Sequence, residues 1–146
     1  KRADEWLEFA DVDLRSAAKL IDDEYLTRAA AFHAHQCVEK SIKALLEMLE
    51  KRVPKTHDLA LLVDAIRTSG LDPSIDDDML DEMNQVYIEA RYPADFGLLP
   101  GGTPTTEIVR NFIELATEIH RFATKTIGEW PDRSTDDAWT ASGDEG

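Results

Sequence analysis

Apolar residues recur at three- and four-residue intervals along almost the whole chain, and this spacing constrains the fold more than any other feature. Such intervals place the apolar side chains on one face of an α-helix. No segment of useful length alternates between apolar and polar residues, as a half-buried β-strand would. The sequence therefore predicts an all-α protein without a sheet.

The first half of the chain predicts three helices separated by short connections. The first carries Asp13 at the margin of its apolar face and ends before a turn at residues 22–25. The second is the longest, spans about residues 27–51 and ends before Pro54, which cannot continue a helix. Apolar residues expected on the inward face of the first helix are Trp6, Phe9, Ala10, Ala17, Leu20 and Ile21.

The third helix is short and has a signal at each end. Thr56 is expected to be its N-cap, because a threonine hydroxyl can accept a hydrogen bond from a free amide of the first turn. Gly70 is expected to follow its last turn in the left-handed conformation that glycine adopts at low cost. Its inward residues are Leu59, Leu62, Val63 and Ile66.

Two further helices complete the predicted fold. The fourth begins in the acidic run 76–78, which suits the positive end of a helix dipole, and continues to Ala90. Pro93 then disfavours helix, and residues 91–104 hold three prolines and three glycines, so an irregular loop is expected. The fifth helix spans about residues 105–127. The expected architecture is an antiparallel up-and-down four-helix bundle with an additional short helix.

The C-terminal residues differ in composition from the helical region. Residues 130–146 are rich in Pro, Asp, Ser, Thr, Gly and Ala, and their charged side chains sum to −4. Such a segment buries too little apolar surface to hold a stable structure of its own. We expect a helical-bundle domain over residues 1–129, followed by an irregular acidic tail over residues 130–146.

The overall charge argues against generic nucleic-acid binding. The chain has 16 Lys plus Arg against 30 Asp plus Glu, a formal charge of −14, whereas proteins that displace counterions from phosphates usually present a positive field. Residues 40–55 are an exception, with five cations against two carboxylates. Three of the cations, Lys51, Arg52 and Lys55, follow a predicted helix end, where the dipole favours positive charge.

The remaining composition excludes several classes of protein. A single cysteine, Cys37, cannot form an internal disulfide or a zinc site that needs paired cysteines. The apolar runs are too short to span a bilayer, and the first residues lack the apolar core of a signal peptide. These features predict a cytoplasmic protein that does not associate with a membrane.

Familiar cofactor and metal motifs are missing from the sequence. There is no glycine-rich phosphate loop, no dinucleotide glycine fingerprint and no Glu-x-x-His pair of a di-metal bundle. His33 and His35 lie two residues apart, which on a helix directs them about 200° apart and prevents them from sharing a metal ion. We therefore expect no cofactor and no metal.

Three stretches and one scattered set of residues resemble a known family. The stretches are residues 31–46 (Ala-Phe-His-Ala-His-Gln-Cys-Val-Glu-Lys-Ser-Ile-Lys-Ala-Leu-Leu), 55–59 (Lys-Thr-His-Asp-Leu) and 87–93 (Tyr-Ile-Glu-Ala-Arg-Tyr-Pro). Each is similar, in the same order, to a helix or helix end of the prokaryotic HEPN family (higher eukaryotes and prokaryotes nucleotide-binding domain). The first helix adds Trp6, Asp13, Leu14 and Ala17, so the resemblance covers about residues 5–127.

The resemblance implies a four-helix bundle that usually forms a homodimer and is often encoded beside a minimal nucleotidyltransferase. Many members of the family are metal-independent ribonucleases of toxin–antitoxin or defence systems. Their catalytic signature is an arginine followed by a histidine after four to six residues. In that signature the arginine stabilises charge on the phosphate, and the histidine transfers protons.

This sequence departs from the catalytic signature. Arg91 occupies the expected position, but residues 96–98 are Phe, Gly and Leu, so the histidine is missing. Arg28 and Arg52 also precede histidines at that spacing, but they lie on other elements. The Arg-Tyr-Pro form at residues 91–93 resembles the branch of the family that is regarded as binding modules rather than nucleases.

Seven residues are candidates for a functional site. Several of them also have a structural interpretation. His33 could be a hydrogen-bonded packing residue, His57 part of a helix start, and Lys40 and Lys43 the solvated side of a helix. Tyr87 and Arg91 are four apart and could pair on one helical face. The catalytic candidates are Arg91, His33 and His57, and the ligand- or phosphate-binding candidates are Arg91, Tyr92, Tyr87, Lys40, Lys43 and His33.

Three hypotheses follow for the function. The leading one is a non-catalytic HEPN module that binds a nucleotide, a minimal nucleotidyltransferase partner, or both. The second is a metal-independent ribonuclease toxin in which Arg91 works with a non-standard histidine, His33 or His57. The third is a protein whose activity is homodimeric assembly through exposed apolar helix faces.

Overall fold

The computed structural model describes residues 2–90 and 103–131, and within these residues it contains helices and no strand. The predicted all-α class is therefore confirmed. The break at Pro93, most of the loop at residues 91–104 and most of the tail at residues 130–146 lie outside the described residues. The elements are α1 (Arg2–Leu20), the 3-10 turn η1 (Glu24–Leu26), α2 (Thr27–Met48), α3 (Leu59–Thr68), α4 (Asp77–Ala90) and α5 (Thr106–Glu129).

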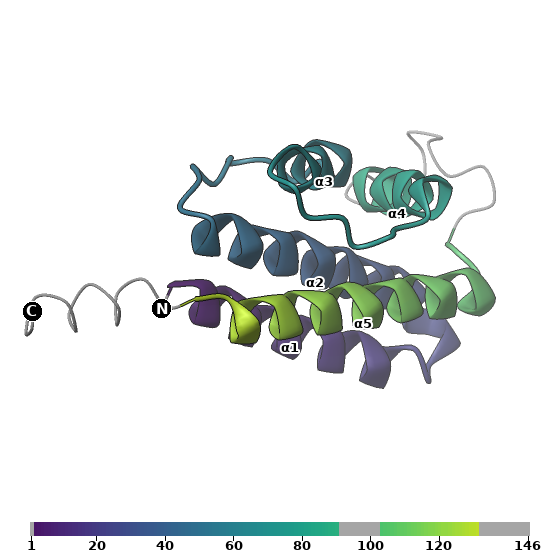
Figure 1. Cartoon of the computed structure of the whole chain (residues 1–146). Helices are drawn as coiled ribbons and strands as arrows, with labels where there is room; N and C mark the ends of the chain where they lie inside the picture. Colours follow the sequence, from purple (N-terminus) through teal and green to yellow (C-terminus); the bar gives the residue numbers. More distant parts are fainter. Residues whose placement is uncertain (1, 91–102, 132–146) are drawn as a thin grey trace, which may run out of the picture.

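Helix α2 is the central element of the fold. It packs against all four of the other helices, and Figure 1 shows it between α1 on one side and the short helices α3 and α4 on the other. Helix α5 runs alongside both α1 and α2 (Figure 1). From residue 34 to residue 46 every residue of α2 except Lys40 is buried. No described helix is long and apolar enough to cross a bilayer.

Small residues allow α1 to lie close against its neighbours. Ala3, Ala10 and Ala17 are buried and seven residues apart, an interval that returns to nearly the same face of a helix. The prediction that Phe9 faces inward is wrong, because its side chain is 58% exposed. Asp13, expected at the margin, is buried because its carboxylate bonds to side chains of α2.

Helix α2 ends at Met48, about three residues earlier than predicted. The chain turns out of the helix at Glu50, which has a left-handed φ of 58°. The amides of Glu50 and Lys51 donate to the carbonyls of Glu47 and Leu46, both at 3.0 Å, in the pattern of a Schellman motif. The helix therefore ends well before Pro54, and Glu50 occupies the position after it that usually holds glycine.

The two ends of α3 differ in how well they were predicted. Thr56 is not its N-cap: Asp58 accepts the Ala60 amide at 2.9 Å, and Thr56 Oγ1 instead accepts the Asp58 amide at 3.1 Å. The role of Gly70 is confirmed, with φ at 96° and its amide bonded to the carbonyl of Arg67. The start of α3 thus lies two residues later than the threonine suggested.

Helices α4 and α5 begin where the sequence predicts. Asp76 accepts the amides of Asp78 and Met79 at 3.0 and 3.3 Å. Thr105 accepts the amide of Ile108 at 3.1 Å. The apolar stripe of α5 packs into the core through Val109, Phe112, Leu115, Ala116, Ile119 and Ala123, with Ile108 and Phe122 partly buried beside it.

Candidate functional site

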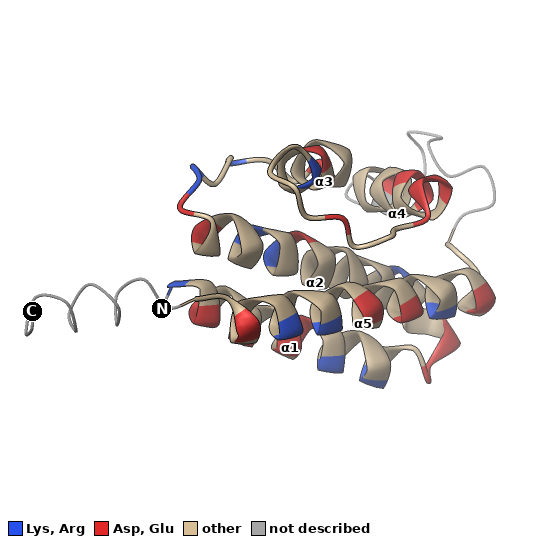
Figure 2. Cartoon of the chain, in the orientation of Figure 1, with Lys and Arg blue, Asp and Glu red and all other residues tan. Residues whose placement is uncertain are grey.

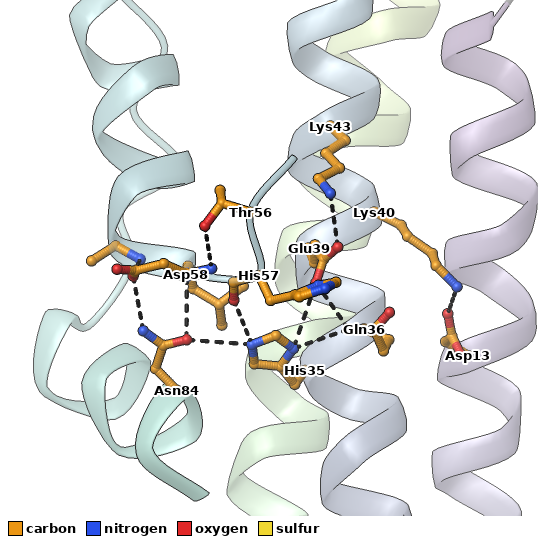
Figure 3. Close-up of polar contacts among 12 residues, drawn as sticks. Asp13, His35, Gln36, Glu39, Lys40, Lys43, Thr56, His57, Asp58 and Asn84 are labelled. Atoms are coloured by element: carbon orange, nitrogen blue, oxygen red, sulfur yellow. Dashed lines mark hydrogen bonds and ion pairs between the residues drawn. The ribbon is translucent and has the colours of Figure 1, made fainter. Parts of the chain in front are cut away.

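The polar residues of interest lie on α2, where the helix is surrounded by other elements. Six of its buried residues are polar or charged: Thr27, His35, Gln36, Glu39, Ser41 and Lys43. Burying such groups is costly unless they find partners, and the hydrogen bonds of His35, Gln36, Glu39 and Lys43 define the local structure. Figure 3 shows that the contacts fall into two clusters on different sides of α2.

Glu39 is the centre of the larger cluster. Its Oε1 accepts from Gln36 Nε2 at 2.9 Å and bonds to His57 Nδ1 at 3.0 Å, and its Oε2 accepts from Lys43 Nζ at 2.8 Å (Figure 3). Burial alone would raise the pKa of Glu39, but the hydrogen bonds from Lys43 and His57 outweigh it and lower the pKa below its ordinary value. The carboxylate is therefore ionised at neutral pH although its side chain is only 4% exposed.

His35 joins α2 to the loop before α3 and to α4. Its Nε2 lies 3.0 Å from the carbonyl oxygen of His57 and 3.3 Å from Asn84 Oδ1. Both neighbours are acceptors, so Nε2 carries the proton, and Nδ1 accepts from Gln36 Nε2 at 3.3 Å. Burial lowers the pKa of His35 to about 4, and the ring is neutral at physiological pH.

Asn84 completes this cluster from α4. Its Oδ1 accepts the Leu59 amide at 3.2 Å, and its Nδ2 donates to Asp58 Oδ1 at 2.9 Å (Figure 3). One amide side chain therefore ties α4 to the first turn of α3 and to His35. We call the connected side chains the Glu39 network: His35, Gln36, Glu39, Lys43, His57 and Asn84.

An aromatic column covers the Glu39 network. The Tyr87 ring stacks on His35 with centroids 3.7 Å apart and planes 8° apart. Phe32 stacks on Tyr87 with centroids 5.7 Å apart and planes 18° apart, and His57 approaches Tyr87 at 5.8 Å. Tyr87 is buried, whereas Phe32 is 38% exposed. The column thus runs from the interior of the protein to its surface.

The smaller cluster lies between α1 and α2 and centres on Asp13. Its Oδ1 bonds to His33 Nδ1 at 2.8 Å, and its Oδ2 accepts from Lys40 Nζ at 2.7 Å. Nearer the end of α2, Trp6 Nε1 donates to Glu47 at 3.4 Å. These contacts hold α1 against α2, so His33 has the packing role that was one of its two interpretations.

The structure separates the sequence-predicted site residues into these two clusters. His33 and Lys40 meet at Asp13, while Lys43, His57 and Tyr87 meet at or above Glu39. The expectation that Lys43 lies on a solvated helix side is wrong, because it is buried in an ion pair, and Lys40 is half-buried. Arg91 and Tyr92 lie outside the described residues.

Sequence reasoning missed Glu39, His35 and Asn84 as site residues. A usable signal was present, because residues 35, 39 and 43 are polar and four apart, forming a single stripe along a helix. Apart from Gln36, Lys40 and Ser41, the other residues between 34 and 46 are apolar, which is typical of a buried helix. Among the described residues, no group of His, Cys, Asp and Glu is arranged to hold a metal ion.

Comparisons with known proteins agree with this architecture. Residues 3–127 match the model of the family described as the HEPN domain. The fold is similar to the crystal structure of an archaeal HEPN homologue, with a TM-score of 0.62 and 22% sequence identity, over 87% of this chain and 98% of that one. A search of curated proteins finds no match. The match covers most of the chain, and the chain therefore belongs to the HEPN domain family.

Proposed function

We propose that this chain is a non-catalytic HEPN module that binds a nucleotide and acts beside a minimal nucleotidyltransferase. The observation that carries the proposal is the burial and protonation state of His35, which stacks on Tyr87 of α4. His35 is buried under Tyr87 and neutral, with its pKa lowered to about 4, so it is unsuited to proton transfer at neutral pH. The sequence has no histidine at the signature spacing after Arg91.

The charge distribution supports binding of a phosphate-bearing ligand near this site. Lys51, Arg52 and Lys55 are exposed on the connection between α2 and α3, and Figure 2 shows cations there as well as on α1, α2 and α5. His57 fixes the end of the connection to α2, through its ring and through its carbonyl oxygen. Arg91 follows the last described residue of α4 directly in the sequence.

A metal-free RNA-cleavage time course with the purified protein and an Arg91→Ala variant tests the non-catalytic part of the proposal. We expect transfer and messenger RNA to stay intact with both proteins. Calorimetric titration with ATP and GTP tests the binding part, and we expect binding by the wild type and a loss of about tenfold or more in the variant, since a charged phosphate contact is removed. RNA cleavage by the wild type that the variant lacks would contradict the proposal.

One observation favours the ribonuclease alternative. The Glu39–His57 pair resembles the carboxylate–imidazole arrangement of catalytic dyads: the carboxylate holds Nδ1 at 3.0 Å, and the ring is 55% exposed. If the chain cuts RNA, His57 is the described residue best placed to exchange protons with a substrate. Cleavage that His57→Ala abolishes and His33→Ala retains would establish this alternative.

We also propose a homodimer as the working form, together with the nucleotidyltransferase partner. Other exposed apolar side chains, Val12 on α1 and Leu61 on α3, supply surface that such contacts could cover. Light scattering across a concentration series tests the homodimer, and co-expression with a minimal nucleotidyltransferase tests the partner. A strict monomer would remove the homodimer and the assembly-protein alternative together.

A further inference from the structure

We infer that Phe32 is the platform on which the base of the bound nucleotide stacks. This inference rests on the proposed nucleotide-binding function and adds the part of the ligand that is recognised and the residue that recognises it. It comes from the aromatic column above the Glu39 network and from the exposure of the column's outer ring.

The column is already ordered as a stack. His35 and Tyr87 are nearly parallel, with planes 8° apart, and Tyr87 and Phe32 differ by 18°. His35 is fixed from below by the His57 carbonyl and Asn84, so the first ring cannot turn. Three successive rings with similar planes therefore present an outer ring whose orientation is fixed before any ligand arrives.

The two aromatic neighbours of Phe32 leave part of its side chain accessible. Tyr87 lies against one face of the ring, and His33 meets it edge-on, with centroids 5.3 Å apart and planes 83° apart. Phe32 is nevertheless 38% exposed, so its accessible surface lies away from these two neighbours. A flat aromatic ligand can extend the column on that side, and a nucleobase has the required shape and a π-face.

Polar groups near Phe32 suit the rest of a nucleotide. His33 donates its Nδ1 proton to Asp13, and its side chain is 31% exposed, so its Nε2 can accept a hydrogen bond from a sugar hydroxyl. His57, which also faces Tyr87, is exposed on the end of the basic connection that carries Lys55. A base on Phe32 would thus lie near two imidazole rings.

Calorimetric titrations with two probes test the inference: ATP, which has a base, and inorganic tripolyphosphate, which has none. Phe32→Ala should weaken ATP binding about tenfold or more, the usual effect of losing an aromatic stacking partner, and leave tripolyphosphate binding unchanged. Phe9→Ala is the matched control, because Phe9 is an exposed phenylalanine on α1, and it should change neither affinity. Phe32→Leu retains apolar packing on Tyr87 and should still weaken ATP binding selectively.

The outcomes separate this inference from the function on which it rests. If wild type binds neither probe, the proposed function and the inference both fail. If wild type binds ATP and the folded Phe32→Leu variant binds it equally well, nucleotide binding stands and Phe32 is not the platform. Equal weakening of both probes would also overturn the inference, because it would place the effect on phosphate contacts. Thermal melting of each variant shows which proteins are folded.

Discussion

Glu39 and its three donors show how a charged residue can be kept in the interior of this small helical protein. Its two oxygens are bonded to Gln36, Lys43 and His57. These hydrogen bonds replace the bonds to water that the carboxylate loses on burial. The arrangement makes each donor depend on the others, because removing one leaves a buried charge partly uncompensated. The two lysines of α2 allow a direct test of this dependence.

Lys43→Ala should lower the free energy of unfolding by about 3 kcal/mol or more, because it removes one partner of a buried pair. Lys40→Ala should cost about 1 kcal/mol or less, because Lys40 is half-buried and Asp13 keeps its bond to His33. Urea denaturation of both variants measures the difference. If both variants lost the same free energy of unfolding, burial would not explain how much the Glu39–Lys43 pair contributes to stability.

His35 makes stability depend on pH in a defined window. Its pKa falls from 6.5 to about 4 on burial, so the unfolded chain binds a proton between these values that the native chain does not. The free energy of unfolding is therefore not reduced by His35 above pH 6.5, and it falls as the pH drops toward 4. At 1.36 kcal/mol per pKa unit, the loss is about 3 kcal/mol at most. The lowered pKa of Glu39 adds a further loss only below its ordinary value of 4.5.

Urea midpoints measured from pH 7 to pH 4.5 test this effect. We expect the midpoint of the wild type to fall over this range, and a folded His35→Gln variant to show a shallower decline, because the buried group that titrates has been removed. Parallel declines in the two proteins would assign the pH dependence to other groups.

At the scale of the elements, two glycines illustrate how backbone conformation sets the effect of a substitution. A Cβ would meet nothing within 4 Å at either Gly70 or Gly128, so space does not distinguish them. Gly70→Ala should cost about 1 kcal/mol, because φ at 96° is strained for alanine. Gly128→Ala, in the last turn of α5, should stabilise by about 0.5 kcal/mol, because alanine is the better helix former.

Thermal melting of the two glycine variants gives the sign directly. We expect the midpoint to fall for Gly70→Ala and to rise for Gly128→Ala. The account of the α3 end would be wrong if both midpoints moved in the same direction.

The helices themselves were largely predictable from the sequence, because each carries a clear apolar stripe and most carry a cap. Asp76, Thr105 and Gly70 act where local rules place them. The end of α2 was misplaced because Glu50 adopts the left-handed conformation, which local rules assign to glycine or asparagine. Phe9 was misplaced because α1 packs against its neighbours through small residues seven apart, Ala3, Ala10 and Ala17, rather than through large apolar ones.

The candidate site was predictable only in part. His57, Lys43 and Tyr87 were singled out, but Glu39, which joins the first two, was not. Helical periodicity assumes one solvated face, and α2 has none between residues 34 and 46 apart from Lys40. Whether a polar stripe faces water or other elements of the protein depends on tertiary packing, which a local pattern does not contain.

At the scale of the whole molecule, α2 connects the packing core to the candidate binding face. It contacts α1 and α5 on one side, and α3 and α4 cover it on the other, where the Glu39 network lies (Figures 1 and 3). Phe32 of α2 stacks there on Tyr87 of α4. The formal charge of −14 repels polyanions in general, so a phosphate-bearing ligand is expected to bind only where cations are concentrated. The central claim is that a nucleotide binds on this face of α2.

The four histidines provide the most direct measurement of that claim, because they report from different places. His33 and His57 lie beside the proposed site, whereas His120 bonds to the Leu7 carbonyl at 3.3 Å, between α5 and α1. In an NMR titration with ATP that follows the imidazole resonances, we predict saturable shifts of His33 and His57 and none of His120. Resonances that do not move at all, or a shift of His120 as large as the other two, would contradict the account.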